Sequence, residues 1–223
     1  MLHGVVRYEK VSSLSLTLWI PLAGFLGVSA PCMARAASGA SADHQRGPTL
    51  NVRVYGFQGL SAWTLQGAET EAARMLRPVN IELTWVDCGS RVPAASCVSP
   101  QGSVDLIVRF VAKALPVASD HALGITGSSG DGVVAFIFYD RVAALRTHTR
   151  TLPAMLGRVM AHEITHLLLP RQGHSGMGLM KGEWAADDLQ IASTRCLGLS
   201  TKSVQFMQKE AFRRMLNAHA LGN

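Results

Sequence analysis

The sequence predicts a single α+β domain of α/β-like character, built around a twisted, mostly parallel sheet. Short runs of aliphatic and β-branched residues alternate with a segment whose apolar residues recur at helical spacing. A long apolar helix pattern follows these runs, and a second long pattern, with lysine and arginine on its outer face, lies near the end of the chain. Residues 49–223 are enough to bury one sizeable core, so we expect one domain there.

The first elements form a β-α unit followed by two more strands. Polar and apolar residues alternate over 51–57, as in a strand, and apolar residues recur at helical spacing over 61–76. A second strand is expected at 81–86. Residues 104–111 are dense in aliphatic and β-branched side chains, which predicts a strand buried on both faces. Together these segments indicate a mostly parallel sheet.

Two short strands and three helices complete the predicted domain. A short edge strand is expected at 122–126, and a glycine- and serine-rich turn then leads into a strand at 133–139. The long helix is predicted to span 152–169, because between Leu156 and Leu169 only Gly157 disfavours a helix, and one glycine is tolerated there. The last two helices are expected at 187–194 and 202–219.

The N-terminus predicts a secretory signal peptide over 1–36. Arg7 and Lys10 precede an apolar, uncharged stretch, and an Ala-Arg-Ala sequence ending at Ala36 supplies the small residues that a signal peptidase recognises. Prolines and glycines within the apolar stretch disfavour a permanent membrane helix, so we expect no stable membrane insertion after cleavage. The mature protein is then secreted or periplasmic, with a flexible leader rich in alanine, serine and glycine at 37–48.

The charge of the chain is mildly basic. Its formal net charge is +6 at pH 7, and removal of the predicted signal peptide lowers this value by two. The lysines and arginines are scattered, without runs and without interleaved aromatic residues. We therefore expect no nucleic-acid partner.

The cysteines suit an oxidising compartment. Cys32 leaves with the predicted signal peptide, while Cys88 and Cys97 flank a short loop that a disulfide could close. Cys196 is the odd cysteine, and both a buried free thiol and a disulfide to Cys88 or Cys97 remain open for it. A cysteine zinc ligand is not expected, because the chain has no Cys-x-x-Cys pair.

The strongest chemical signal is the sequence His-Glu-Ile-Thr-His at 162–166, inside the predicted long helix. His162 and His166 stand four positions apart and therefore project from one face of the helix, where both imidazoles can hold one cation. Glu163 lies beside them and His174 supplies a third imidazole. Three protein ligands suit Zn²⁺ and leave its fourth position open to water, as a hydrolytic site requires.

Residues 159–180 resemble the metzincin peptidases, whose pattern is His-Glu-x-x-His-x-x-Gly-x-x-His followed by a methionine turn. Two positions depart from that pattern, because Leu169 stands at the glycine position and Gln172 at the position of the third histidine. The nearest histidine, His174, comes two residues later. Pro170 ends the helix and a glycine precedes His174, so a longer turn can still return this ligand to the site.

Two further features of residues 159–180 are similar to those of the matrixin group of metzincins. The His-Ser pair at 174–175 and the Gly-Leu-Met sequence ending at Met180 look like matrixin segments. The longer spacing before His174 looks most like that of a group of bacterial secreted proteins. Because Leu169 and Gln172 depart from the family pattern, another possibility is that the domain has kept the metzincin fold but lost its activity. The presence of Glu163 argues against such a loss of activity.

The resemblance implies a secreted zinc-dependent endopeptidase that acts on peptides or proteins. It implies Zn²⁺ as the cofactor and Glu163 as the general base that assists water, with Met180 in a structural turn beneath the metal. It also implies an antiparallel edge strand near 122–126, to which an extended peptide substrate adds as a strand. The implied metal ligands are His162, His166 and His174.

Two other interpretations remain open from the sequence. Glu183, followed by Asp187, is similar to the downstream acidic motif of gluzincin peptidases and would then replace His174 as third ligand. The same carboxylates also suit the solvated start of a helix. Alternatively, the protein is a non-catalytic secreted binding module whose zinc joins the helix to the turn at His174, with a fourth protein ligand closing the site.

Overall fold

The computed structural model describes most of the predicted domain. The predicted helix at 187–194 and most of the predicted signal peptide and leader lie outside the described residues. The described residues are 47–89, 95–129, 132–146, 148, 151–170, 173–184 and 198–221, together with the backbone of His3–Val5.

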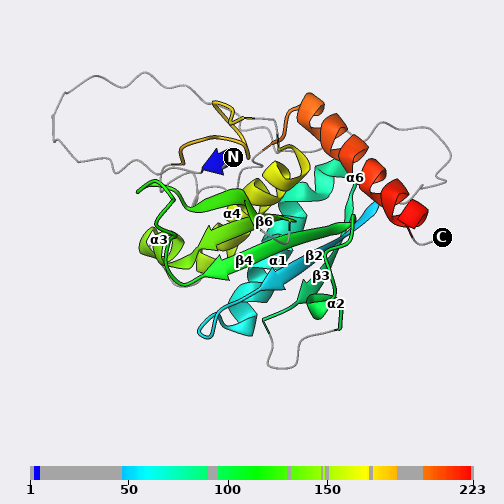
Figure 1. The fold of residues 1–223 in the computed structure, drawn as a ribbon. Coiled ribbons are helices and arrows are strands. Elements are labelled where there is room, and N and C mark those ends of the chain that lie inside the picture. The colour runs from blue at the N-terminus through cyan, green and yellow to red at the C-terminus, as the bar shows by residue number, and fades with distance from the viewer. Residues whose placement is uncertain are drawn as a thin grey trace, which may run out of the picture.

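A six-stranded sheet of order β1-β5-β6-β4-β2-β3 forms the centre of the fold (Figure 1). Strands β2, β3, β4 and β6 pair in parallel, whereas β5 runs antiparallel to β6 and β1 antiparallel to β5. The predicted fold class, a mostly parallel sheet with an antiparallel strand near one edge, is confirmed. The strands are β1 (His3–Val5), β2 (Thr49–Tyr55), β3 (Glu82–Asp87), β4 (Asp105–Val111), β5 (Gly124–Ser129) and β6 (Gly132–Phe138).

Two helices, α1 and α4, lie side by side against one face of the sheet (Figure 1). Helix α6 crosses the end of α4 and also contacts β2. The predicted long helix and C-terminal helix are therefore present as α4 and α6. The described helices are α1 (Ala62–Leu76), the 3₁₀ turn η1 (Arg77–Val79), α2 (Ala95–Val98), α3 (Tyr139–Ala144), α4 (Leu152–Leu168) and α6 (Thr201–Leu221).

Several boundaries differ from the sequence prediction around β5. The strand expected at 122–126 begins at Gly124 and continues to Ser129, because pairing with β6 extends the ladder through residues of low strand propensity, up to the pair Ser129 and Gly132. Strand β1 pairs with the outer side of β5, so β5 is not the outermost strand. Helices α2 and α3 are short and were not expected, since segments of this length carry little periodicity.

Glycines allow α1 and α4 to approach each other closely. A Cβ atom on Gly67 would lie 2.6 Å from the Cβ atom of Pro153, and one on Gly157 would lie 2.4 Å from the carbonyl oxygen of Ala68. No side chain fits at such distances. Helix α4 is buried along almost its whole length, between the sheet, α1 and α6. The glycine in the middle of the predicted helix therefore serves packing, and the residues of α4 are held in fixed positions.

A buried ion pair adds a polar link between the same two helices. The Nε atom of Arg158 in α4 donates to an Oε atom of Glu71 in α1 at 3.0 Å, and the Arg158 side chain is only 1% exposed. Glu71 also accepts two hydrogen bonds from Arg74. Because a buried guanidinium requires a counter-charge, Glu71 determines how α4 sits against α1.

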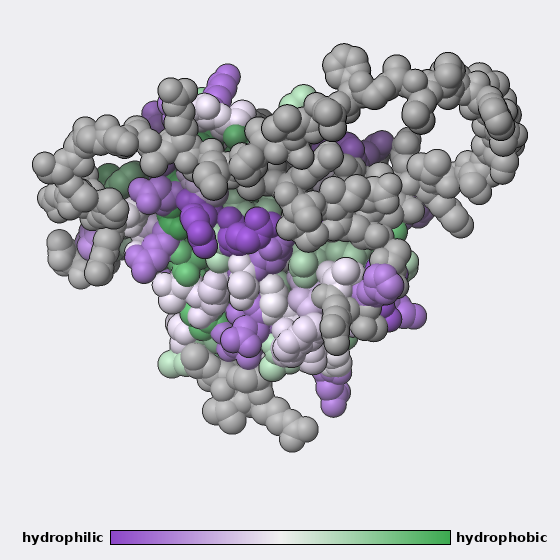
Figure 2. All heavy atoms as spheres, turned by 180° about the vertical axis from the view of Figure 1, so that it is seen from behind, coloured by the Kyte–Doolittle hydropathy of each residue, from purple (hydrophilic) through white to green (hydrophobic). Residues whose placement is uncertain are grey.

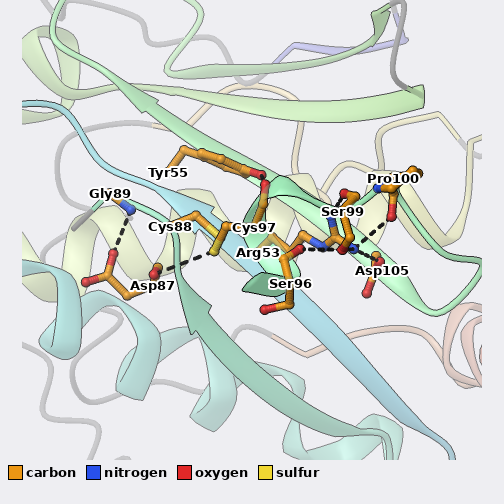
Figure 3. Close-up of a disulfide and its surroundings, with 10 residues drawn as sticks. All are labelled: Arg53, Tyr55, Asp87, Cys88, Gly89, Ser96, Cys97, Ser99, Pro100 and Asp105. Carbon is orange, nitrogen blue, oxygen red and sulfur yellow. Dashed lines mark hydrogen bonds and ion pairs between the residues drawn. A yellow bond between two sulfur atoms is a disulfide. The ribbon is translucent and has the colours of Figure 1, made fainter. Parts of the chain in front are cut away.

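The opposite face of the sheet carries a disulfide. Cys88, just after β3, is bonded to Cys97 in α2, with their Cα atoms 5.5 Å apart (Figure 3). Of the pairings that the sequence left open, the structure therefore contains the one between Cys88 and Cys97; Cys196 lies outside the described residues. The carbonyl oxygen of Cys97 also accepts a hydrogen bond from the Tyr55 hydroxyl of β2 at 3.0 Å. The disulfide thus closes the loop next to β2.

Arg53 attaches the chain after Cys97 to the same face of the sheet. Its guanidinium pairs with Asp105 at the start of β4 and donates to the carbonyl oxygens of Ser99 at 2.7 Å and Pro100 at 3.0 Å (Figure 3). Arg53 and Asp105 are both buried. The loop from the disulfide to β4 is therefore fixed by polar contacts on the side of the sheet away from α4.

Hydrophobic surface is limited on the face seen from behind. In that view, apolar side chains of the described residues form only small, separated patches among hydrophilic and intermediate ones (Figure 2). Within the described ranges, none of the helices combines the length and the hydropathy that crossing a membrane requires.

We predict that Glu71→Leu destabilises the fold by roughly 3–5 kcal/mol, because it leaves the buried guanidinium of Arg158 without its carboxylate. Urea unfolding followed by circular dichroism measures the change in the free energy of unfolding. The matched control is the double variant Glu71→Leu/Arg158→Met, in which both charges are removed and most of the stability should return. A single variant as stable as the unmodified protein would refute the role of this ion pair.

Candidate metal centre

The His-Glu-Ile-Thr-His sequence lies in the last turns of α4. The side chains of His162 and His166 project from one face of the helix, with ring centroids 4.7 Å apart, and both are buried. Helix α4 ends at Leu168, immediately before the turn that Pro170 imposes. The chain is thereby free to fold back toward the two imidazoles.

His174 meets these two histidines from the returning segment. The Nε2 atom of His166 lies 3.1 Å from that of His162 and 3.2 Å from that of His174. One ligand atom from each residue falls within 4.8 Å of the others, and these three residues form a group able to hold a metal ion among the residues that the structure describes. His174 is exposed, whereas the other two are buried, so the site opens on the side of His174.

The spacing of the three nitrogens fits a tetrahedral zinc site. With Zn–N bonds of about 2.0–2.1 Å, neighbouring ligand nitrogens of a tetrahedron lie about 3.3–3.4 Å apart. The two Nε2 separations that involve His166, 3.1 and 3.2 Å, are close to that value. Uncharged imidazoles brought so near to one another are also a typical zinc donor set. The residues present therefore fit Zn²⁺, with one coordination position left for a non-protein ligand.

A backbone carbonyl determines the tautomer of His162. Its Nδ1 atom lies 2.7 Å from the carbonyl oxygen of Leu179, which can only accept, so Nδ1 carries the proton and Nε2 keeps its lone pair. Burial lowers the pKa of His162 well below its usual range, the nearby His166 lowers it further, and the hydrogen bond to Leu179 opposes the shift. His162 is therefore held in the uncharged form that binds metals.

Backbone hydrogen bonds hold the turn that carries Leu179. The amide of Ser175 donates to the carbonyl oxygen of Met180 at 2.7 Å, and the amide of Leu179 donates to that of Gly198 at 3.2 Å. Gly178 has a φ of +74°, and a Cβ atom there would lie 2.3 Å from the Gly198 oxygen, so only glycine fits. Leu179 and Met180 are buried. The turn thus positions both the Leu179 carbonyl and the segment that begins at His174.

Gly182 lies directly against the imidazole of His174. A Cβ atom at Gly182 would be 3.0 Å from the Cβ, 3.1 Å from the Cγ and 3.3 Å from the Nδ1 atom of His174. On the inner side, the ring of Trp184 stands edge-on to that of His162, with centroids 5.5 Å apart, and Trp184 is buried. The segment after Met180 therefore supports two of the three histidines.

Glu163 is completely buried between α4 and β5. Its Oε2 atom accepts a hydrogen bond from the hydroxyl of Thr126 at 2.6 Å. Its Oε1 atom has no hydrogen-bond partner within the part of the chain that the structure describes. Burial raises the pKa of Glu163 to about 8, and the hydrogen bond from Thr126 opposes that shift. A divalent cation held by the adjacent imidazoles would favour the carboxylate form.

The alternative third ligand, Glu183, does not join the cluster. It is exposed, and the group of potential metal ligands contains His174 in its place. Asp187 and Gln172 lie outside the described residues. The geometry thus brings the three histidines together, and Glu163 is the residue that follows His162 in α4.

Four residues of the site were not identified from the sequence. Thr126, Leu179, Gly182 and Trp184 each contact one of the motif residues or His174. Two of them lie in segments with an expected role: Thr126 at the end of the predicted edge strand and Leu179 in the expected methionine turn. The others come close to α4 through the return of the chain after Pro170, and no local pattern marks such contacts.

Comparison with solved structures finds remote similarities, including the following two. The fold is similar to the crystal structure of archaemetzincin from Methanopyrus kandleri, at 15% sequence identity and a TM-score of 0.47, over 75% of this chain and 98% of that chain. It is also similar to metalloproteinase-II from Bacteroides fragilis, at 13% identity and a TM-score of 0.45, over 74% of this chain and 53% of that chain. No family model matches the sequence, and no curated protein matches it.

We predict that Gly182→Ala weakens zinc binding by about tenfold or more, because the added methyl group displaces the imidazole of His174. Competition with a chromophoric chelator measures the Kd for zinc. Gly176→Ala is the matched control, since a Cβ atom at Gly176 meets nothing within 4 Å. Equal zinc affinities of the two variants would contradict the positioning role of Gly182.

Proposed function

We propose that the protein is a zinc-dependent endopeptidase that hydrolyses peptide bonds with the assistance of Glu163. The observation that carries this proposal is the convergence of three imidazole Nε2 atoms beside a buried carboxylate. A structural zinc site would need a fourth protein ligand, and the cluster among the described residues has three. The buried carboxyl group of Glu163, next to His162 in α4, favours a hydrolytic site over the binding module.

The chain's own residues have distinct roles in this mechanism. His162, His166 and His174 would hold Zn²⁺, which when bound supplies a Lewis acid that polarises the scissile carbonyl group and lowers the pKa of water. Glu163 accepts a proton from the attacking water and then donates it to the leaving amine. The Leu179 carbonyl keeps His162 in the required tautomer. Burial of the histidines of α4 excludes bulk water from the inner side of the site.

Strand β5 supports the proposal that an extended peptide binds by strand addition. Strand β5 lies next to α4, and the side chain of Thr126 in this strand contacts Glu163. A peptide paired with the outer side of β5 would therefore pass near the proposed general base. In the full chain that outer side pairs with β1, through His3 with Thr126 and Val5 with Ile125. We propose that export, with removal of residues 1–36, frees this side of β5 for substrate.

Variants of Glu163 and His162 distinguish the proposed general base from the metal ligands. Glu163→Gln should retain zinc and lose about 10²–10⁴-fold in kcat, because the amide cannot accept the proton of water. His162→Ala should lose zinc as well as activity, because one ligand is missing. Elemental analysis for zinc and cleavage of a quenched peptide library measure both properties.

The unmodified protein provides the controls. Its cleavage should stop when a chelator removes zinc and return when zinc is added back. Cleavage by Glu163→Gln at the rate of the unmodified protein would refute the role of Glu163, and stoichiometric zinc in His162→Ala would refute that ligand. An unmodified protein that binds one zinc and cleaves nothing would favour the binding module.

Retention of residues 1–36 tests whether β1 covers the proposed substrate edge of β5. A protein in which bulky residues replace Ala34 and Ala36, so that signal peptidase cannot remove 1–36, should show a higher KM than the processed protein. An increase on the order of tenfold is expected, because a tethered strand competes with the peptide for β5 at high effective concentration. Steady-state kinetics on both forms measure KM and kcat. Equal KM values would show that β1 does not cover the substrate edge.

A further inference from the structure

Thr126 and Glu163 form the contact between β5 and the proposed general base. The Thr126 side chain is 4% exposed and Glu163 is fully buried, so water does not compete for their hydrogen bond. The hydroxyl donates to Oε2 of Glu163 at 2.6 Å, a distance typical of a hydrogen bond to a carboxylate. One of the two oxygens of Glu163 is therefore held by a side chain 37 residues earlier in the chain.

The other carboxylate oxygen occupies space that a glycine provides. Gly124 lies two residues before Thr126 on the same face of β5, and a Cβ atom there would be 2.8 Å from Oε1 of Glu163 and 2.9 Å from the carbonyl oxygen of Phe136. Within the described residues, Oε1 has no hydrogen-bond partner although it is buried. The carboxylate thus has one anchored oxygen and one oxygen whose acceptor capacity is unused.

The anchor itself is rigid because β5 is paired with β6. Thr126 lies opposite Ala135 and Gly124 opposite Ile137 in the antiparallel ladder. Ala135 and Ile137 belong to the core on which α4 packs, so both ends of the Thr126–Glu163 contact are fixed by well-packed elements. A hydroxyl held in this way can select one rotamer of a glutamate.

We propose that Thr126 is a positioning residue for catalysis, whose hydroxyl holds Oε2 of Glu163 so that Oε1 is the oxygen that exchanges a proton with water. This inference rests on the proposed peptidase function. It assigns different tasks to the two oxygens of one carboxylate, and it places the anchor on the same strand that we propose as the substrate edge. Thr126 acts through Glu163 and does not itself touch the reacting atoms.

The test compares Thr126→Val, which removes the hydroxyl at nearly constant shape, with Thr126→Ser, which keeps it. In the exported and processed protein, Thr126→Val should keep one zinc and an unchanged KM while kcat falls about 10- to 100-fold. Thr126→Ser should recover kcat to within a few-fold of the unmodified protein. A kcat for Thr126→Val equal to that of the unmodified protein, or a loss that Thr126→Ser does not recover, overturns the proposal.

Two controls separate positioning from a general structural effect. Thr64→Val removes another buried hydroxyl, which lies 2.8 Å from the hydroxyl of Ser61 at the start of α1, and should leave kcat within a few-fold of the unmodified value. In the Glu163→Gln background, Thr126→Val should cause no further loss of kcat, because its effect passes through the Glu163 carboxylate. Equal losses in the two backgrounds overturn the proposal.

A measurement without catalysis distinguishes failure of this inference from failure of the proposed function. The unfolding equilibrium constants of the unmodified protein, Thr126→Val, Glu163→Leu and the double variant Thr126→Val/Glu163→Leu form a double-mutant cycle, in which each single change removes the hydrogen bond between the two side chains. We expect a coupling of about three- to tenfold in that constant, as for a buried hydrogen bond. An inactive unmodified protein refutes the peptidase proposal alone, whereas an absent coupling overturns the role of Thr126 whether or not peptides are cleaved.

Discussion

The burial of α4 is the constraint on which the rest of the structure depends. This helix buries the side chains of Arg158, His162, Glu163 and His166, and buried polar or charged groups destabilise a fold unless they have partners. Glu71 of α1 neutralises Arg158, the carbonyl group of Leu179 accepts from His162, and Thr126 of β5 donates to Glu163. These partners come from three different parts of the chain, so the buried polar groups of α4 find their partners only in the complete tertiary fold.

The same contacts that stabilise α4 also prepare the candidate site for chemistry. Because the Leu179 carbonyl takes the Nδ1 proton of His162, the Nε2 lone pair points toward the Nε2 atoms of His166 and His174. Because Gly178 leaves room where any side chain would clash, and Gly182 gives the imidazole of His174 more space than a larger residue would, the returning segment can bring His174 against the helix. Pre-organisation of this kind lowers the cost of ordering a site when a metal or substrate binds.

Strand β5 connects the candidate site to the surface that we propose for substrate. One of its faces contacts Glu163 through Thr126 and Gly124, and its outer side pairs with β1 in the full chain. The opposite face of the sheet is fixed independently by the Cys88–Cys97 disulfide and Arg53. The face of the sheet that carries the candidate site is thus held through α4 and β5, and the other face through a disulfide and an ion pair.

The sequence by itself determined the elements and the chemical character of the site. Local periodicity is sufficient to locate β2, α1, β4, α4 and α6, and the four-residue spacing of His162 and His166 places them on one helix face whatever the fold. The start of β5 at Gly124, the pairing of β1 with β5 and the contacts of Thr126, Leu179 and Gly182 were decided by tertiary structure. Strand pairing, close approach of backbones and hydrogen bonds between distant segments depend on which surfaces meet in space, and a local pattern along the chain does not contain that information.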